Sequence, residues 1–223
     1  MAAAAEGSSP AGSAALTLRP AVAADAPAAA GLILSSMGRF GEVLLGFGDE
    51  SKARGVLERW FPRAGHRFSS RFATLAELDG ELAGLLLGFP ASDLWRLELG
   101  LAPVLRLAYS PGELLHFISG NLALLRLKEA ERGDWLVAHV ATEPRFRQHG
   151  VARCLMAEAE ALARRAGCKR CALLVELDNE PARRLYASLG YQAMGEQRWP
   201  RLEAMGSPGF ARMVKPLVEG PAG

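Results

Sequence analysis

Two apolar runs in the middle of the chain show the clearest strand pattern. Residues 72–89 place these runs on either side of Asp79 and Gly80, a dipeptide that suits a tight turn with positive φ, and so predict a β-hairpin. Residues 134–142 and 171–178 are almost continuously apolar, as expected for strands that are covered on both faces. The chain is therefore expected to form a sheet with a buried centre.

Helical spacing separates the two buried strands and follows the second. Residues 151–167 carry apolar side chains on one helical face and end in a glycine, which is a common stop signal. Residues 179–190 predict a shorter helix, with Asn179 as its N-cap and Pro181 in its first turn. Two last strands are expected at 191–199 and 211–217. Because strands joined through a helix usually lie parallel, this order predicts a parallel pair with a right-handed crossover.

The N-terminal part of the chain has a simpler pattern. Residues 1–14 contain alanine, glycine, serine and proline with one charged residue, so they cannot build a core and are expected to be a disordered tail. Residues 16–25 predict a short strand and the start of a helix. The helix continues over 25–37, and Asp25 is a candidate N-cap.

Residues 90–134 break the strand pattern and form an insertion after the hairpin. Pro111, Gly112 and Glu113 resemble a helix start. The apolar residues after them follow helical spacing, namely Leu114, Leu115, Ile118, Leu122 and Leu125. A structureless loop of about forty-five residues is improbable in a compact domain, so we expect the insertion to have helices of its own.

Composition supports one domain of mixed α/β class. The 223 residues are 50% hydrophobic and 22% charged, which is enough apolar material for a single core over residues 15–220, insertion included. Lysine and arginine number 26 against 24 acidic residues, a net charge of +2. Such a balance argues against binding to nucleic acid or to a membrane surface.

The cysteines and the N-terminus bear on compartment. Cys168 and Cys171 have the C-x-x-C spacing, but the four histidines are scattered and offer no second pair of ligands, so no metal is expected. The N-terminus lacks the basic start and apolar core of a signal peptide, and no run reaches the roughly 18 to 20 apolar residues that span a bilayer. We therefore expect a cytoplasmic protein with reduced thiols.

The segment RFRQHGVA, residues 145–152, connects the first buried strand to its helix. A helix N-terminus exposes about four unpaired N–H groups and roughly half a positive charge, so such a turn can hold a phosphate or pyrophosphate. Gly150 would let the backbone approach the anion, Ala152 keeps the next position small, and Arg147 can add a charged contact. A plain exposed turn is the alternative. The Walker and dinucleotide motifs are absent, which argues against a nucleotide-binding protein.

A polar helix face is expected beside this turn. Asn179, Arg183 and Tyr186 follow the spacing i, i+4, i+7 and so share one face of the second helix. Three apolar residues are expected to face elsewhere, namely Ala182, Leu185 and Leu189. Asn179 alternatively serves only as the N-cap, and Tyr186 only as an amphipathic residue at the edge of the core.

These two segments resemble the motifs of a known family. Residues 140–155, VATEPRFRQHGVARCL, resemble the acetyl-CoA-binding motif of the GNAT superfamily of acyltransferases, with 147–152 matching Q/R-x-x-G-x-G/A. Residues 179–191 are similar to its second motif, N-x-x-A-x-x-L-Y-x-x-x-G-F/Y. The resemblance covers 134–191 closely and the hairpin and first helix in outline, and it omits 90–134. It implies the GNAT fold: a central mixed β-sheet with a splayed strand pair and helices on both faces, here with a helical insertion before the cofactor-binding strand.

The resemblance also implies an activity and its residues. It implies an N-acetyltransferase that uses acetyl-CoA, without a metal, to acetylate a primary amine of a small molecule or peptide in a ternary complex. Backbone groups would hold the pantetheine arm and the acetyl carbonyl at Val140, Ala141 and Thr142. The pyrophosphate would be bound by Arg147, Gln148, His149, Gly150, Val151 and Ala152. Asn179 and Arg183 have the family positions beside the cofactor arm, and Tyr186 has the position of the general acid.

The general base has no clear counterpart. One branch of the family places a glutamate at the position of Leu174, and another places acidic or histidine residues at the positions of Leu136 and Ala138. Strand alternation directs His139 to the opposite face, as a core or surface residue. Glu176 has the same parity as Leu174 and is the candidate base. A solvated strand end at Glu176, or a base acting through water, stays open.

Two alternatives concern function and the insertion. The missing glutamate favours, as second hypothesis, a non-catalytic acyl-CoA-binding sensor or regulatory module. The insertion is expected to shape the acceptor pocket through Trp95, Leu99 or Phe117, or else to form a cap or the interface of a homodimer. The sequence leaves the amine acceptor unidentified, and it does not distinguish acetyl from longer acyl donors.

Overall fold

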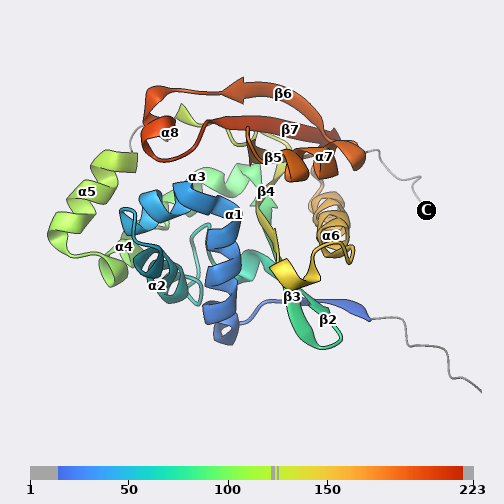
Figure 1. Cartoon of the computed structure of the whole chain (residues 1–223), viewed down its shortest axis with the longest axis horizontal. Coiled ribbons are helices and arrows are strands. Elements are labelled where there is room, and N and C mark those ends of the chain that lie inside the picture. Colours follow the sequence, from blue (N-terminus) through green and yellow to red (C-terminus); the bar gives the residue numbers. More distant parts are fainter. Residues whose placement is uncertain (1–14, 122–123, 125, 218–223) are drawn as a thin grey trace, which may run out of the picture.

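The computed structural model describes residues 15–121, 124 and 126–217. The expected tail at 1–14, and Leu122 and Leu125 of the expected apolar stripe, lie outside these residues. One seven-stranded sheet has the order β1-β2-β3-β4-β5-β7-β6 (Figure 1). Only β4 and β5 pair in parallel, and every other neighbouring pair is antiparallel. The strands are β1 Leu16–Pro20, β2 Ala73–Leu78, β3 Glu81–Pro90, β4 Asp134–Thr142, β5 Arg170–Glu176, β6 Gln192–Gln197 and β7 Phe210–Pro216. The mixed α/β class is confirmed.

Helices cover both faces of the sheet (Figure 1). One face carries α1 Ala26–Gly46, α2 Glu50–Trp60 and the insertion helices α3 Leu94–Leu99, α4 Ala102–Ala108 and α5 Pro111–Asn121. The other face carries α6 Val151–Arg165 and α7 Glu180–Ser188. The helix α8, Pro200–Ala204, lies between β6 and β7, and short 3-10 turns occupy Ala23–Asp25, Ser70–Phe72, Ala91–Asp93 and Pro144–Phe146. Each face therefore has its own apolar core.

Several local signals act as the sequence predicts. Asp79 and Gly80 have φ of 52° and 81°, as a tight hairpin turn requires. The side chain of Asn179 caps α7 by accepting from the Ala182 N–H at 3.2 Å. At the start of α5 the Glu113 carboxylate accepts from the Ser110 N–H at 2.8 Å, which is one of the two hydrogen bonds of a capping box. The points at which these elements begin or turn are thus determined by neighbouring residues.

The first helix differs from its prediction. It extends to Gly46 instead of 37, bends at Gly38, where φ is 56°, and is followed by α2, which the pattern did not predict. Asp25 does not cap α1 with its side chain, because its carboxylate accepts from the Val22 N–H at 2.7 Å and pairs with Arg19 at 2.8 Å. The acidic residue therefore orders the preceding 3-10 turn and β1.

The segment Ala23–Gly46 also has the length and apolar composition of a membrane span, and it is the one such helix in the described part of the chain. The apolar runs of the sequence do not predict a segment of this kind. Its buried residues pack with α2 and the sheet in a shared core cluster. Core packing therefore accounts for its composition.

The insertion is helical, as expected, but its apolar stripe is oriented differently. Leu115 and Ile118 are 70% and 46% exposed. Leu114 of the predicted stripe does pack against the core, and Phe117 packs there with it, its ring stacked on Tyr109 at 5.0 Å. The packed side of α5 is thus set by its contact with α1 and α4.

The parallel pair separates partway along its length. Cα partners run from Asp134 and Arg170 to Val137 and Leu173, although β4 continues to Thr142 and β5 to Glu176. The expected splayed pair is therefore present. Beyond Val137 the β4 edge that faces β5 pairs with no strand in the described part of the chain.

A buried ionic cluster holds the closed end of this pair. The Asp134 carboxylate is buried at the start of β4 and accepts from Arg170 on β5 at 2.6 Å and from Arg212 on β7 at 2.7 Å. Three neighbouring strands are thereby joined through one side chain.

Asp134→Ala is expected to lower the free energy of unfolding by about 3 kcal/mol, because it leaves the buried Arg212 guanidinium with only Glu131 at 3.5 Å. Asp93→Ala is the control, since its ion pair with Arg96 is exposed and should contribute less than about 1 kcal/mol. Urea denaturation measures both. Equal, small losses in the two variants would show that the Asp134 cluster contributes no more than a surface pair.

Candidate active site

A cleft of about 1240 Å³ opens where β4 and β5 separate. Its walls come from α1, the splayed ends of the two strands, the turn before α6, the first part of α7 and the insertion. Elements that are far apart in the sequence therefore meet at one cavity. Every predicted site residue can be placed relative to it.

The turn before α6 adopts the geometry of an anion-binding nest. Gln148 and Gly150 both have positive φ, 66° and 79°, while Arg147 between strand and turn is extended. Among the described residues no side chain caps α6, so its first N–H groups are left for another acceptor. A Cβ at Gly150 would meet nothing within 4 Å, so open space lies over the nest. Alternating backbone handedness of this kind turns successive N–H groups toward one point.

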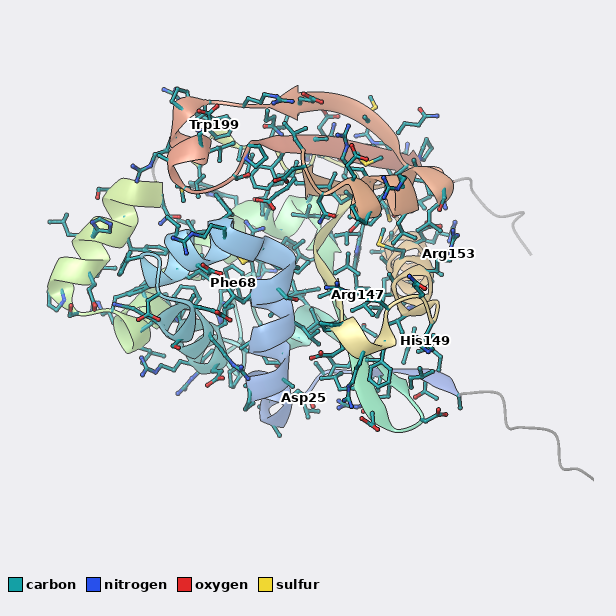
Figure 2. All side chains as sticks on the ribbon, in the orientation of Figure 1. Asp25, Phe68, Arg147, His149, Arg153 and Trp199 are labelled. Carbon is teal, nitrogen blue, oxygen red and sulfur yellow. The ribbon has the colours of Figure 1, made fainter. Side chains whose placement is uncertain are left out.

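Five of the six predicted turn residues line the cleft, and His149 does not. The His149 imidazole Nδ1 instead lies 2.8 Å from the Arg147 carbonyl oxygen. Arg153, which the motif did not single out, lines the cleft one helical turn later. Figure 2 shows Arg147 and Arg153 near the start of α6, where the Arg153 guanidinium donates to the Ser188 hydroxyl of α7 at 2.9 Å.

The splayed end of β4 contributes backbone to the same cleft. Val140, Ala141 and Thr142 all line it, as the resemblance implied. They pair with β3 on one side only, since β5 has diverged. The Thr142 hydroxyl is buried and has no partner in the described structure. This strand edge can therefore hydrogen bond to an extended ligand.

The orientation of α7 corrects part of the prediction. Asn179 and Tyr186 line the cleft, but Arg183 does not, because its guanidinium donates to the Leu177 carbonyl at 3.0 Å. Ala182 and Leu185, which were expected to face elsewhere, line the cleft instead. Contact with the sheet thus rotates the helix, so that the cleft wall is more apolar than predicted.

Tyr186 is a buried residue at the wall of the cleft. Burial raises the pKa of Tyr186 to about 12. The phenol therefore stays protonated at neutral pH. Its ring lies 6.1 Å from that of Tyr191, which keeps the side chain packed in the core of that face.

Glu176 lies at the end of β5 and lines the cleft. Its Oε1 is buried without a hydrogen-bond partner in the described structure. Burial raises the pKa of Glu176, and the nearby Ser207 hydroxyl opposes part of this rise by stabilising the carboxylate. A Cβ at Gly38 would lie 3.6 Å from Glu176 Oε2, so the bend in α1 borders the carboxylate. One oxygen of the carboxylate is therefore withdrawn from solvent at the end of the strand, where the residue as a whole is half-buried.

His139 also lines the cleft, which contradicts the prediction from strand alternation. The register between β3 and β4 shifts, with Leu87 opposite His139 and Gly88 opposite Val137, so Ala138 forms a β-bulge. A bulge inserts one residue and reverses the facing of those that follow. His139 is therefore on the α1 face, where its ring stacks on Phe68 with centroids 5.5 Å apart.

The hydrogen bonds of His139 fix its tautomer. Ser36 Oγ lies 2.6 Å from the Ile33 carbonyl, to which it donates, and 2.9 Å from His139 Nδ1. Nδ1 must then carry the proton, so Nε2 is an acceptor. This Nε2 is buried without a partner in the described structure. Burial and the positive charge of Arg67 lower the pKa of His139 to about 3, so the ring is neutral.

The insertion lines one end of the cleft, although no motif identified it. Trp95 and Phe117 contribute to the wall as expected, whereas Leu99 does not and is 58% exposed. Glu98 and Glu129 also line it and pair with Arg67, which lies in the loop before β2. Only the tertiary structure brings these charges together.

The described residues contain no group of three histidine, cysteine or acidic side chains that could hold a metal ion. Cys154, Cys168 and Cys171 are free thiols. Cys171 is buried, and burial raises its pKa to about 12. A thiol of this kind is a poor nucleophile at neutral pH.

Comparisons with known proteins agree with this geometry. The model of the acetyltransferase (GNAT) family matches residues 41–191. The chloroplastic GCN5-related N-acetyltransferase 4 of Arabidopsis thaliana is 32% identical over 92 residues, which are 40% of this chain and 32% of that protein. The chain therefore matches about a third of that relative's length.

Solved structures share the fold. An acetyltransferase aligns over 90% of this chain and 99% of its own, with a TM-score of 0.64 and 23% identity. An N-acetyltransferase from Staphylococcus aureus Mu50 aligns over 89% of this chain and 100% of its own, with a TM-score of 0.69 and 18% identity. The family model covers more than half of the chain, including both strands of the splayed pair and the turn between them. The chain belongs to the GNAT family of acetyltransferases.

Proposed function

We propose that this protein is an acetyl-CoA-dependent N-acetyltransferase that acetylates a primary amine by direct attack in a ternary complex. The observation that carries the proposal is the convergence of three features on one cleft: the nest of the 147–152 turn, the unpaired edge of β4 and the phenol of Tyr186. The family membership supports the same reaction class.

The cleft fits the donor at its α6 end. The nest and Arg147 suit the pyrophosphate, because oriented N–H groups and a guanidinium both stabilise negative charge. The free edge of β4 over Val140, Ala141 and Thr142 suits the amide-bearing pantetheine arm. The donor supplies an acetyl thioester, and the residues of this chain bind it, orient it and move protons around it.

Tyr186 is proposed as the general acid. The departing sulfur has an ordinary thiol pKa near 8.5, and a phenol with a pKa of about 12 stays protonated beside it at neutral pH. Full proton transfer is uphill, but a positioned hydrogen bond already stabilises the developing negative charge on sulfur. The buried site strengthens this interaction.

Glu176 is proposed as the general base. The nitrogen of an ammonium group must lose a proton before it can attack the thioester, and a base is most effective when its pKa approaches the working pH. The raised pKa of Glu176 moves it in that direction. The neutral His139 ring offers Nε2 as a second acceptor for the amine.

Gly150→Val is expected to weaken acetyl-CoA binding at least tenfold, about 1.4 kcal/mol, since valine disfavours φ of 79° and fills the space over the nest. Gly167→Val is the matched control at the other end of α6, where φ is 70° and nothing lies within 4 Å of the new Cβ. Calorimetry on both folded variants measures the affinity. An equal loss in both would assign the effect to backbone strain, and unchanged affinity in Gly150→Val would exclude the nest as the donor site.

Tyr186→Phe is expected to reduce kcat roughly a hundredfold while the affinity for acetyl-CoA is retained, because only proton donation is lost. Thiol release with an amine panel measures turnover, and calorimetry measures binding. If the variant keeps the wild-type kcat, the phenol has a structural role only. A wild-type protein that binds acetyl-CoA but releases no thiol with any amine would instead be the non-catalytic sensor.

The pH profile tests Glu176. The base acts when deprotonated, so kcat/KM is expected to rise with pH through a pKa above the ordinary 4.5 of glutamate, and Glu176→Gln should lower and flatten this acidic limb. The stability of the protein should change with pH in the opposite direction. Because the pKa of Glu176 is raised in the folded state, its ionisation lowers the free energy of unfolding as pH rises above 4.5. At pH 7 Glu176→Gln should therefore melt no lower than wild type. A variant with an unchanged profile would remove Glu176 as the base.

A further inference from the structure

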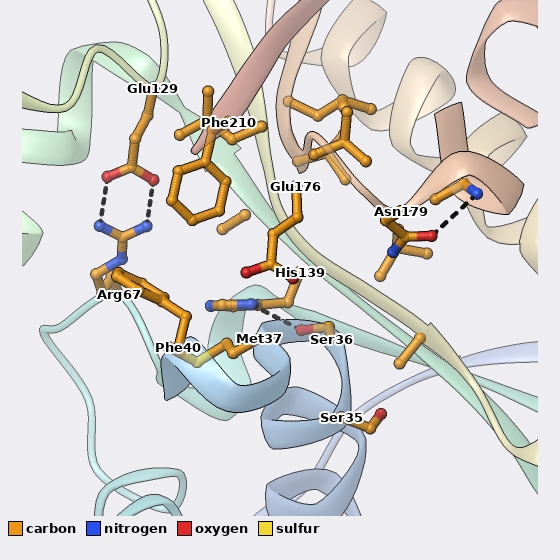
Figure 3. A pocket seen from close by; sticks show the side chains of 18 of the residues that line it. Ser35, Ser36, Met37, Phe40, Arg67, Glu129, His139, Glu176, Asn179 and Phe210 are labelled. Carbon is orange, nitrogen blue, oxygen red and sulfur yellow. Dashed lines mark hydrogen bonds and ion pairs between the residues drawn. The ribbon is translucent and has the colours of Figure 1, made fainter. Parts of the chain in front are cut away.

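The cleft continues beyond Glu176 into a compartment between α1, β7 and the insertion. Figure 3 shows Glu176 and His139 between Asn179 on one side and the Arg67–Glu129 pair on the other. The nest lies at the α6 end, so this compartment is left for the amine acceptor. We call it the acceptor compartment, and its apolar wall includes Met37, Phe40, Leu101, Phe117 and Phe210.

The charges of the acceptor compartment do not favour an anionic acceptor. Arg67 is its only cation among the described lining residues, and both of its terminal nitrogens are engaged by Glu129, at 2.7 and 2.6 Å. Glu98 also accepts from Arg67. One guanidinium thus faces two carboxylates, and the His139 ring is neutral. A carboxylate on the acceptor would find no free cation and would be repelled by the excess negative charge.

Two buried hydrogen-bond acceptors indicate which chemical group of a ligand binds in this compartment. His139 Nε2 and Glu176 Oε1 are both buried and without a partner in the described structure. Leaving such atoms unsatisfied is costly, so a ligand that donates to both is favoured. A primary amine has at least two N–H donors. A hydroxyl has one donor and satisfies only one of the two atoms.

The wall of the compartment indicates what carries the amine. Phe40 from α1, Phe117 from α5 and Phe210 from β7 contribute aromatic surface, and Met37 and Leu101 contribute aliphatic surface. Binding in pockets of this kind comes mainly from apolar contact, while a few polar groups orient the ligand. Apolar walls around one pair of hydrogen-bond acceptor atoms suit a ligand whose amine lies at the end of an apolar body.

We infer that the acceptor is a primary amine carried on an apolar, ring-sized body without a carboxylate near the amine. The inference rests on the proposed transferase function. In the reaction the amine nitrogen forms a bond to the acetyl carbon and the carbon–sulfur bond breaks. Glu176 takes a proton from nitrogen, and Tyr186 stabilises or protonates the departing sulfur.

The test compares three amines by thiol release from acetyl-CoA, namely 2-phenylethylamine, ethylamine and L-phenylalanine. The first two differ by the ring, and the first and third differ by the carboxylate. The kcat/KM for 2-phenylethylamine is expected to exceed that of each other amine at least tenfold. Ratios of this size are typical when a substrate lacks an apolar group that the pocket binds, or carries a polar group that the pocket does not match.

A pair of variants locates the ring. Leu101→Gln, in the wall, should raise KM for 2-phenylethylamine at least fivefold and leave KM for ethylamine and the affinity for acetyl-CoA unchanged. Leu99→Gln, an exposed position that does not line the cleft, is the control and should change none of these values. If Leu101→Gln does not fold, the comparison of amines on the wild type still decides the inference.

The outcomes separate the inference from the proposed function. Thiol release that is faster with ethylamine or L-phenylalanine would overturn the acceptor class and keep the transferase. Equal KM effects of Leu101→Gln on both amines would overturn the location of the ring. No thiol release with any amine, while calorimetry shows bound acetyl-CoA, would overturn the proposed function and the inference together.

Discussion

The separation of β4 and β5 after Val137 and Leu173 is the constraint on which the rest of the structure depends. Paired strands leave no room between them, so a cleft in the middle of a sheet requires backbone groups that give up their strand partners. The Asp134 cluster fastens the other end of the pair through Arg170 and Arg212. One end can therefore open while the sheet as a whole stays continuous.

The bulge at Ala138 determines which polar side chain of β4 faces the cleft. Without it, His139 would face the α6 side, and the α1 side of the strand would carry only apolar residues near Glu176. With it, a neutral imidazole fixed by Ser36 and a buried carboxylate both present unsatisfied acceptors to the cleft. Such atoms reduce stability in the free protein, and a ligand that donates to them recovers that free energy. A stability cost at this place is what a binding site is expected to show.

The insertion completes the cleft at the end away from the nest. Arg67, in the loop before β2, binds Glu98 on α3 and Glu129 after α5, so an ionic cluster attaches the inserted segment to the body of the domain. The same cluster sets the sign of the charge near the proposed acceptor. The residues that attach the insertion to the domain are thus the same residues that set the charge of the acceptor compartment. The preference for an acceptor therefore depends on how α3 and α5 pack against α1.

The sequence by itself determined the features that depend on neighbouring residues. The Asp79-Gly80 turn, the Asn179 cap, the glycine that permits the 147–152 nest and the order of buried strands all follow from local conformational preference. Two motifs in their expected order also indicated where the proposed donor site would lie, because an anion-binding turn is built from consecutive backbone groups.

Only the tertiary structure decided which side chains face the cleft. Alternation misplaced His139, since a bulge depends on the pairing of two distant strands. Helical spacing misplaced Arg183 and the stripe of α5, since the rotation of a short helix is set by what it packs against. The acceptor end assembles Met37, Arg67, Leu101 and Phe210 from four separate segments. No local sequence pattern predicts that these four residues lie together, because their proximity results from the packing of the whole chain.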